Sequence, residues 1–349
     1  MKINVLFIGD LNTYTESKSK CVAFSEIGLN VASLSSEKIP TLPGLNGTNS
    51  FLSKVLRKLQ PMADPNRINC QLRQLVNSGK LNKFEFLWSD KAINISPSTL
   101  SLIKTKSPST KLIFASGDNM AVAAFRNKAF EQSLIYFDAV ITAKSDTLTE
   151  LLELGAKTAY YIPKAFDENW PNLMTYPSKR WDISFVGSFE EARANSMLEL
   201  AKAGLTVNVW GNGWQKWHKK NANLIIHGYP VYSENLVRTI EESKINLCFL
   251  RKLARDKSTN RTFEIPACGG FMLAENTEEQ RDFFPEGQSA AYFKTDRELV
   301  EKCKYYLEND DKRDLISYQG HLKCLKSGYG YSHRCEYFIK NIWPDLKEL

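Results

Sequence analysis

The alternation of apolar, strand-length segments with helical segments is the feature of the sequence that most constrains its fold. Residues 3–9, a helical stretch over 18–27 and residues 29–35 form one strand–helix–strand unit. Further strands are predicted at residues 83–90, 111–116, 138–143 and 158–163. Such alternation is typical of a doubly wound α/β domain with a parallel sheet.

The alternation stops at residue 164 and later starts again. The stretch 164–181, KAFDENWPNLMTYPSKRW, is rich in Pro, Asn and aromatic residues and has no sustained period, which indicates a linker. Strands are then predicted at residues 182–188, 205–211, 223–228, 245–250 and 271–274, with helices over 194–203 and 234–243. Residues 296–349 are mostly helical, with a break at GYGYSH before a final amphipathic segment at 334–343. We therefore expect two Rossmann-like domains at 1–165 and 182–328, a linker at 166–181, and a C-terminal segment at 329–349.

Composition is consistent with two domains of this size. At 349 residues and 43% hydrophobic content, the chain can bury a core in each. The net charge of +7 suits small anionic substrates, nucleic acids and anionic membrane surfaces equally well. The seven cysteines include no CxxC pair, which is typical of reduced thiols. Because no leader peptide is evident and no apolar run approaches the roughly 20 residues of a membrane span, we expect a cytoplasmic protein without a transmembrane segment.

Several common catalytic motifs are absent from the sequence. The turn after the first strand of each domain reads GDLNTY or GSFEEAR instead of GxGxxG, which argues against a standard dinucleotide cofactor. The chain has no GxxxxGK[ST], HExxH or GxSxG motif, and its four histidines form no ligand-like pair. These absences disfavour a hydrolase, an NTPase and a metal site.

The segment 255–275, RDKSTNRTFEIPACGGFMLAE, predicts a binding site for an anion. Thr259 and Asn260 are good N-cap residues, so a short helix is expected to begin there and to end at the glycine pair 269–270. The helix N-terminus and the surrounding basic residues suit a phosphate. The carboxylate of Glu264 can accept hydrogen bonds from sugar hydroxyls, as acids do in dinucleotide folds, or it can stabilise its own helix as a first-turn acid.

Two such domains joined by a linker are expected to place the carboxyl ends of their strands across a central cleft, where ligands bind. At the first turn of the second domain, Gly187 and Ser188 can bring the backbone close to a phosphate. Arg193 can supply a forked donor, or it can be a solvated helix residue. Arg251 and Lys252 end a strand on the cleft side, which suits an anion site.

The order of several segments resembles one known family. The segments are VGSFEEAR, GNGW, HGYPVY, ESKINLCFL and RTFEIPACGGFML in the second half, KFEFLWSDK, FASGDNM and FDAVITA in the first, and YSHRCEYF in the tail. Together they resemble the CgeB-like, spore-maturation-type branch of the group 1 glycosyltransferases over nearly the full length. The resemblance implies the GT-B architecture, with two Rossmann-like domains facing a central cleft and a C-terminal helix, containing Trp343, that crosses back to the first domain.

The resemblance also implies an activity and a donor site. The protein would move a sugar from a nucleotide-diphosphate sugar, such as a UDP- or GDP-sugar, with retention and without a metal or other cofactor. Glu264 would bind the ribose hydroxyls, and Asn260 and Arg261 would face the diphosphate. Tyr229 would stack on the base or fill the domain surface. Asp256 occupies the position where related families place a Glu near the donor sugar, and this substitution puts its catalytic role in doubt.

In the first domain, Gly9, Asp10 and Asn12 form the loop after the first strand, which in this architecture faces donor and acceptor. Asp118 ends a central strand and resembles the family's cleft-facing acid, which would orient the acceptor or stabilise positive charge in the transition state. It is also placed to cap a helix over residues 120–128.

Alternatives to a transferase remain open at this point. A nucleotide-sugar 2-epimerase shares the two-domain plan but needs more catalytic acids and a histidine. A non-catalytic sugar- or nucleotide-binding protein is favoured by the absence of a Glu at position 256. The acceptor can be a glycan, a lipid-linked glycan, a protein or a modified nucleic acid, with peripheral membrane contact as a further option.

Overall fold

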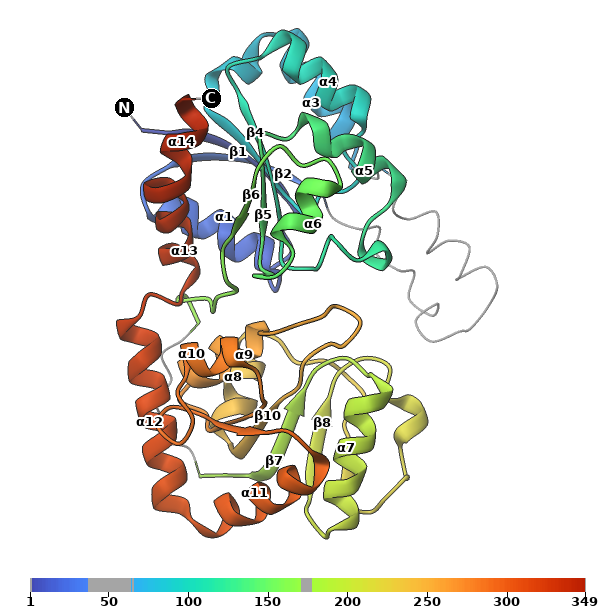
Figure 1. Ribbon diagram of the computed structural model, residues 1–349, viewed down its shortest axis with the longest axis vertical. Coiled ribbons are helices and arrows are strands. Elements are labelled where there is room, and N and C mark those ends of the chain that lie inside the picture. The colour runs from blue at the N-terminus through green and yellow to red at the C-terminus, as the bar shows by residue number, and fades with distance from the viewer. Residues whose placement is uncertain (1, 37–63, 65, 171–177, 349) are drawn as a thin grey trace. The chain divides into compact units, whose positions relative to one another are not determined.

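The computed structural model describes residues 2–36, 64, 66–170 and 178–348, and it divides into two compact units (Figure 1). Unit 1 consists of Met1–Pro163 and Tyr331–Leu349, and unit 2 of Lys164–Gly330. The linker expected at 166–181 lies partly outside the described residues.

Unit 1 contains a parallel sheet of six strands in the order β2-β1-β3-β4-β5-β6. The strands are β1 (Asn4–Gly9), β2 (Asn30–Ser35), β3 (Phe86–Asp90), β4 (Lys111–Ser116), β5 (Ala139–Thr142) and β6 (Ala159–Tyr161). The helices are α1 (Glu16–Glu26), α3 (Ile68–Asn77), α4 (Pro97–Lys106), α5 (Lys128–Ser133) and α6 (Leu148–Glu153). All six predicted strands are confirmed. Strand order reverses between β1 and β3, and ligands of open α/β sheets bind at such switch points.

The C-terminal segment belongs to unit 1. It comprises α13 (Tyr331–Tyr337), a π-helical turn (Phe338–Ile342) and α14 (Trp343–Glu348). The ring of Phe338 is fully buried and lies 6.3 Å from Phe24, 5.6 Å from Phe86 and 5.0 Å from Trp88. Trp343 packs 4.8 Å from Phe86. This aromatic cluster fixes the tail against α1 and β3, which confirms that the C-terminal helix packs on the first domain.

Unit 2 contains a second parallel sheet of six strands, in the order β12-β11-β10-β7-β8-β9. The strands are β7 (Trp181–Val186), β8 (Val207–Trp210), β9 (Leu224–Ile226), β10 (Ser243–Cys248), β11 (Met272–Glu275) and β12 (Ala291–Phe293). The helices are α7 (Glu191–Lys202), α8 (Ser233–Glu241), α9 (Asn260–Ala267), α10 (Glu278–Phe283), α11 (Asp296–Glu308) and α12 (Asp310–Lys326). The strand order reverses between β7 and β10, which places the switch point of unit 2 at the carboxyl ends of those strands.

Candidate functional site

Helix α9 begins where the sequence predicts. Thr259 is its N-cap, and the Thr259 N–H donates to Oγ1 of Thr262 at 3.0 Å as one half of a capping box. The helix ends before Gly269, whose φ of 68° is the left-handed conformation expected after a helix. The first turn of α9 thus has a fixed geometry before any ligand is considered.

A buried glutamine supports this first turn. Oγ1 of Thr262 donates to Oε1 of Gln280 at 2.7 Å, and Nε2 of Gln280 donates to the carbonyl of Glu275 at 2.6 Å. Gln280 is fully buried and lies on α10, a helix that the sequence interpretation did not contain. Its contacts connect the N-terminus of α9 to the end of β11. The only signal in the sequence is Thr277, which caps α10 three residues earlier.

Arg261 and Glu264 are brought together on α9. Nε of Arg261 donates to the carbonyl of Val186, at the end of β7, over 3.2 Å, and its Nη1 donates to Oε2 of Glu264. Burial lowers the pKa of Arg261 to about 10, so the guanidinium stays charged at neutral pH. Glu264 lies beyond the first turn of the helix, so the interpretation of Glu264 as a first-turn acid is wrong.

Arg193 joins the two strands that flank the switch point of unit 2. From α7, Nη1 of Arg193 donates to the carbonyl of Ser188 at 3.1 Å, and Nη2 donates to the carbonyl of Leu250 at 3.4 Å. Glu190 pairs with the same guanidinium at 3.2 Å. The Arg193 side chain is only 7% exposed, so its interpretation as a solvated helix residue is wrong. Burial lowers the pKa of Arg193, and the nearby Glu190 carboxylate opposes that effect.

The Asp256 side chain points toward other residues of its own loop. Its carboxylate is 1% exposed and accepts from Nε of Arg251 at 3.1 Å, while the Asp256 N–H donates to the Arg251 carbonyl at 3.1 Å. The adjacent Lys252 pairs with Glu275. These contacts close the loop after β10. The catalytic role of Asp256 stays a prediction, and the geometry gives this carboxylate a structural task.

The lack of a side chain at Gly211 lets its loop touch the loop at Gly187. A Cβ at Gly211, where φ is 153°, would lie 1.9 Å from the Gly187 carbonyl oxygen. The Gly187 N–H donates to Trp210 at 2.9 Å, and its carbonyl accepts from Nε1 of Trp214 at 2.9 Å. Both polar groups of Gly187 are therefore used within the fold, and a Cβ at Gly187 would lie 2.6 Å from Cζ of Phe185, so close packing accounts for a glycine here.

An aromatic group lies beside the loop after β9. The rings of Trp210 and His227 are stacked, with centroids 4.1 Å apart and planes within 3°. Tyr229 lies edge-on to His227 at 6.2 Å and is 56% exposed. Burial, followed by the charge of Arg180, lowers the pKa of His227 below its usual value, so the imidazole is neutral at pH 7. More than half of Tyr229 is thus accessible to an aromatic ligand. Trp210 and His227, which lie beside it, were not among the predicted site residues.

The loop after β1 in unit 1 has a turn fixed by a side chain. Oδ1 of Asp10 accepts from the backbone N–H of Asn12 at 3.2 Å and from its Nδ2 at 2.9 Å. A Cβ at Gly9 would lie 2.9 Å from Cβ of Ser17, so α1 packs directly on the end of β1. Gly9, Asp10 and Asn12 therefore form one compact turn at the switch point.

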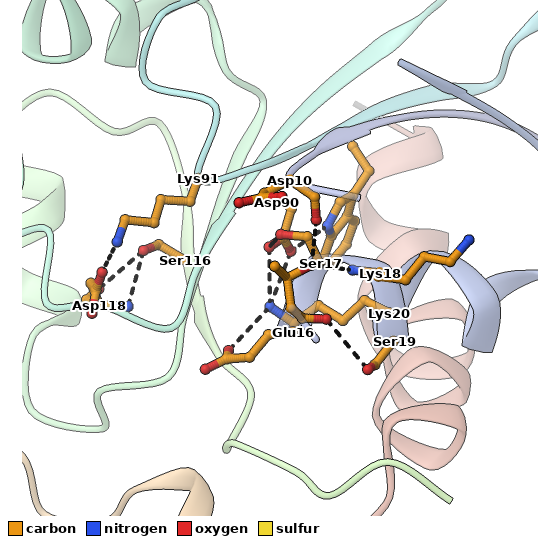
Figure 2. A network of polar contacts seen from close by, with 12 residues as sticks. Asp10, Glu16, Ser17, Lys18, Ser19, Lys20, Asp90, Lys91, Ser116 and Asp118 are labelled. Atoms are coloured by element: carbon orange, nitrogen blue, oxygen red, sulfur yellow. Dashed lines mark hydrogen bonds and ion pairs between the residues drawn. The ribbon is translucent and has the colours of Figure 1, made fainter. Parts of the chain in front are cut away.

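Asp118 lies at the end of β4 and forms an ion pair with Lys91 (Figure 2). The Asp118 side chain is 15% exposed, and its backbone N–H donates to Oγ of Ser116 at 3.1 Å. No α-helix covers residues 120–128, since a 3₁₀ turn occupies Ala123–Phe125 and α5 begins only at Lys128. The interpretation of Asp118 as the cap of that helix is therefore wrong.

Sequence reasoning missed the most buried carboxylate at this edge. Asp90, at the end of β3, is 4% exposed and accepts from Ser17 Oγ at 2.6 Å, Lys20 Nζ at 3.0 Å and Trp88 Nε1 at 3.1 Å. Burial alone would lower the pKa of Lys20, but the carboxylates of Asp90 and Glu16 outweigh that effect and raise it. The available signal was an acid at the carboxyl end of a predicted strand, directly after the segment Phe-Leu-Trp-Ser.

Metal-ligand clusters and membrane-spanning helices are absent from the described residues. Within residues 2–36, 64, 66–170 and 178–348, no three His, Cys, Asp or Glu side chains are placed to hold a metal ion. None of the helices in the described part of the chain combines the length and the hydropathy of a membrane span.

The second half of the chain is similar to a known protein family. Residues 168–340 match the glycosyl transferase-like family model. No curated protein sequence matches the chain. The glycosyl transferase-like segment contains every predicted donor-binding residue, from Gly187 to Glu264, whereas Gly9, Asp10, Asn12 and Asp118 lie outside it.

Solved structures share the fold over the whole length. Sucrose-phosphate synthase from Thermosynechococcus elongatus is 11% identical with a TM-score of 0.63, and the match covers 99% of each chain. Anabaena Alr3699/HepE in complex with UDP-glucose is 10% identical with a TM-score of 0.58, and the match covers 98% of this chain and 100% of that one. A glycosyltransferase from Rickettsia africae is 12% identical with a TM-score of 0.63, over 99% and 98% of the two chains. These likenesses confirm the GT-B fold of the chain, while membership of the CgeB-like branch stays a prediction.

Proposed function

We propose that the protein is a glycosyltransferase that moves a sugar from a nucleotide-diphosphate sugar to an acceptor hydroxyl. The observation that carries this proposal is the contact of Arg261, in the first turn of α9, with the carbonyl of Val186 at the end of β7. It brings a capped helix N-terminus to the switch point of unit 2, where a cation and the positive end of the helix dipole favour a diphosphate. The match of residues 168–340 to the glycosyl transferase-like family supports it.

In this proposal the donor site is built from α9 outward. Asn260 and Arg261 face the diphosphate, and the Glu264 carboxylate accepts hydrogen bonds from the ribose hydroxyls while Arg261 keeps it paired. Tyr229 stacks on the base, since its ring is more than half exposed. Arg193 holds the two backbone segments at the switch point in place.

The leaving group can be stabilised without a metal. The positive end of α9 and the Arg261 guanidinium supply charge where the diphosphate leaves, which is the type of stabilisation that contributes most to many enzymatic rates. We propose retention at the anomeric carbon, because the motif order resembles the group 1 glycosyltransferases. Asp118 of unit 1 then orients the acceptor or stabilises positive charge on the sugar.

Uridine diphosphate sugars are the first donors to test. Among the structural neighbours, Anabaena Alr3699/HepE was solved with UDP and with UDP-glucose. The acceptor class stays open between a glycan, a lipid-linked glycan, a protein and a modified nucleic acid, with peripheral membrane contact as a further proposal.

Epimerisation is the second candidate, because the structure of a putative UDP-N-acetylglucosamine 2-epimerase from Listeria monocytogenes has the same fold at a TM-score of 0.53. The transferase is favoured by the positions of two histidines in unit 2. His227 is stacked on Trp210, and His321 contacts the carbonyl of Ala267 at 2.8 Å, so each is occupied within the fold. Anomeric NMR of the product distinguishes transfer or hydrolysis from inversion at carbon 2.

The test is calorimetry with UDP, GDP, ADP, UDP-glucose and GDP-mannose on wild type, Glu264→Ala and Glu301→Ala. Glu301 is a matched control, since it is an exposed helical acid of the same unit that also pairs with an arginine. We expect Glu264→Ala to weaken binding of the preferred nucleotide by about 1.5 to 3 kcal/mol, the value of one hydrogen bond to a charged group. Equal affinities in all three proteins would remove Glu264 from the site, and failure of every nucleotide to bind wild type would refute the proposed donor class.

A further inference from the structure

The end of β3 contacts helix α1 on one side and the loop after β4 on the other (Figure 2). Asp90 receives Ser17 and Lys20 from α1, which follows β1, whereas the next residue, Lys91, pairs with Asp118 after β4. Lys91 has φ of 52°, a left-handed conformation that is uncommon for a side-chain-bearing residue, and its N–H donates to the carbonyl of Ala115 at 2.8 Å. Two consecutive side chains thus point to opposite neighbours.

The contact between Ser17 and Asp90 is the closest of these to the loop after β1. Ser17 is in the first turn of α1, two residues after its N-cap Thr15, and its hydroxyl donates to Asp90 at 2.6 Å. Both side chains are more than nine-tenths buried. Because Cβ of Ser17 also lies against Gly9, the start of α1 is held to the ends of β1 and β3 together.

We infer that Ser17 and Asp90 are positioning residues that set the conformation of the loop over residues 10–15, and through it the reactive geometry of unit 1. The inference rests on the proposed function, in which Asp10 and Asn12 of this loop face the substrates. The loop has its own turn at Asp10, but its far end is fixed by α1, and α1 is fixed at that end by Asp90. A shift of the helix start therefore moves the loop as a unit.

The Ser17→Ala variant isolates this contact. It removes one hydroxyl and leaves Asp90 bonded to Lys20 and Trp88, so no buried charge loses its partners. Ser133→Ala is the matched control, since Ser133 is 2% exposed in the same unit and donates to the carbonyl of Ala129 at 2.8 Å, on α5. A second variant, Asp90→Asn with Lys20→Met, removes both buried charges and keeps an oxygen that can accept from Ser17.

Amide hydrogen exchange measures local opening of the loop in the absence of a substrate. The amides of Asn12, Thr15 and Lys18 are hydrogen-bonded within the loop and first turn. We expect them to exchange about fivefold to tenfold faster in Ser17→Ala, as local opening becomes easier, and within about twofold of wild type in Ser133→Ala and in the neutral double variant. Unchanged exchange in Ser17→Ala would overturn the inference. Exchange in the double variant as fast as in Ser17→Ala would also overturn it, because the ion pair of Lys20 with Asp90 would then hold the loop.

Turnover distinguishes positioning from simple support. With UDP-glucose as the probe, release of UDP should fall about tenfold in Ser17→Ala, the scale of a small misplacement of reacting groups, while the Kd for UDP stays within about twofold. Faster exchange with unchanged turnover would make the contact a structural tether and overturn the inference. If wild type binds UDP-glucose without turning it over, the proposed function fails instead, and the exchange result alone decides the role of Ser17 and Asp90.

Discussion

The Arg261 guanidinium donates a hydrogen bond to the Glu264 carboxylate, one turn further along α9. Two predicted donor-binding residues are therefore coupled in the absence of a ligand. A substitution that neutralises either one removes the charge that the other pairs with. Binding data on single variants will contain both the lost ligand contact and the unpaired partner.

We predict that Arg261→Met and Glu264→Gln are non-additive in their effects on nucleotide affinity. Because Arg261→Met removes the donor that Glu264 pairs with, and Glu264→Gln removes the negative charge beside Arg261, the double variant should lose less than the sum, with a coupling of about 0.5 to 3 kcal/mol. Calorimetric titration of UDP into the four proteins of the cycle measures it. Strict additivity would show that the pair does not share the ligand site.

Asp118→Asn should separate binding from turnover. Its carboxylate lies in unit 1, so donor affinity should change by no more than a few-fold, while turnover falls by roughly tenfold to a thousandfold, the range for loss of one positioned group. UDP calorimetry and UDP release, measured on the same preparations, decide this. Glu153→Gln, an exposed acid on α6, is the control, and unchanged turnover in Asp118→Asn would exclude a role for this carboxylate in the reaction.

Turnover should survive chelation. The proposed charge stabilisation comes from the α9 N-terminus and from Arg261, which stays protonated through neutral pH because its pKa is about 10. UDP release should therefore be the same before and after EDTA treatment. Loss of activity in EDTA that Mg²⁺ or Mn²⁺ restores would contradict the proposed metal independence.

Glu241 should make the protein less stable at alkaline pH. Burial raises the pKa of Glu241 to about 7, with Lys179 opposing the shift. Between the pKa values of the unfolded and folded states the folded state binds the extra proton, so stability falls as pH rises from about 4.5 to 7. Glu241→Gln should therefore stabilise the protein at pH 8 by on the order of 1 to 3 kcal/mol and have little effect at pH 4.5.

Thermal unfolding at the two pH values measures this difference. Glu234→Gln serves as the control, because Glu234 lies on the same helix with a side chain that is 68% exposed. An equal gain for Glu241→Gln at both pH values would point to packing instead of ionisation.

Phe338→Ala should destabilise unit 1. The ring fills the centre of the aromatic cluster with Phe24, Phe86 and Trp88, and removal of a buried Phe typically costs about 3 to 5 kcal/mol. Denaturant unfolding followed by tryptophan fluorescence measures the loss. Leu325→Ala, which truncates a side chain that is 53% exposed, should change stability by less than about 0.5 kcal/mol.

Element positions followed from the sequence because buried parallel strands are apolar and their flanking turns carry distinctive residues. Helix α9 illustrates this, since Thr259 at its start and Gly269 after its end are local signals. Strand β12 (Ala291–Phe293) was missed, whereas β9 (Leu224–Ile226), equally short, was predicted from its Leu-Ile-Ile run. Helix α10 was missed because its six residues, Glu278–Phe283, are too few to establish a helical period.

Side-chain partners depended on tertiary contacts that no local pattern contains. Arg193 was recognised as a candidate, but its burial between Ser188 and Leu250 depends on the pairing of β7 with β10. The phosphate contact of Gly187 stays a prediction, and its close approach to Gly211 depends on the pairing of β7 with β8. Asp90 was passed over because Ser17, its closest partner, is 73 residues away in the sequence.

Unit 1 is discontinuous in the chain, and this sets an order of events during synthesis. Unit 2 ends at Gly330, so all of its residues leave the ribosome before Phe338 and Trp343, which complete the aromatic cluster of unit 1. Domains generally fold in order from the N-terminus. Here the apolar surface of unit 1 that Phe338 and Trp343 cover stays exposed until unit 2 has been synthesised. A premature stop after Gly330 would yield a complete unit 2 attached to a unit 1 whose Phe86 and Trp88 are open to solvent and to chaperones.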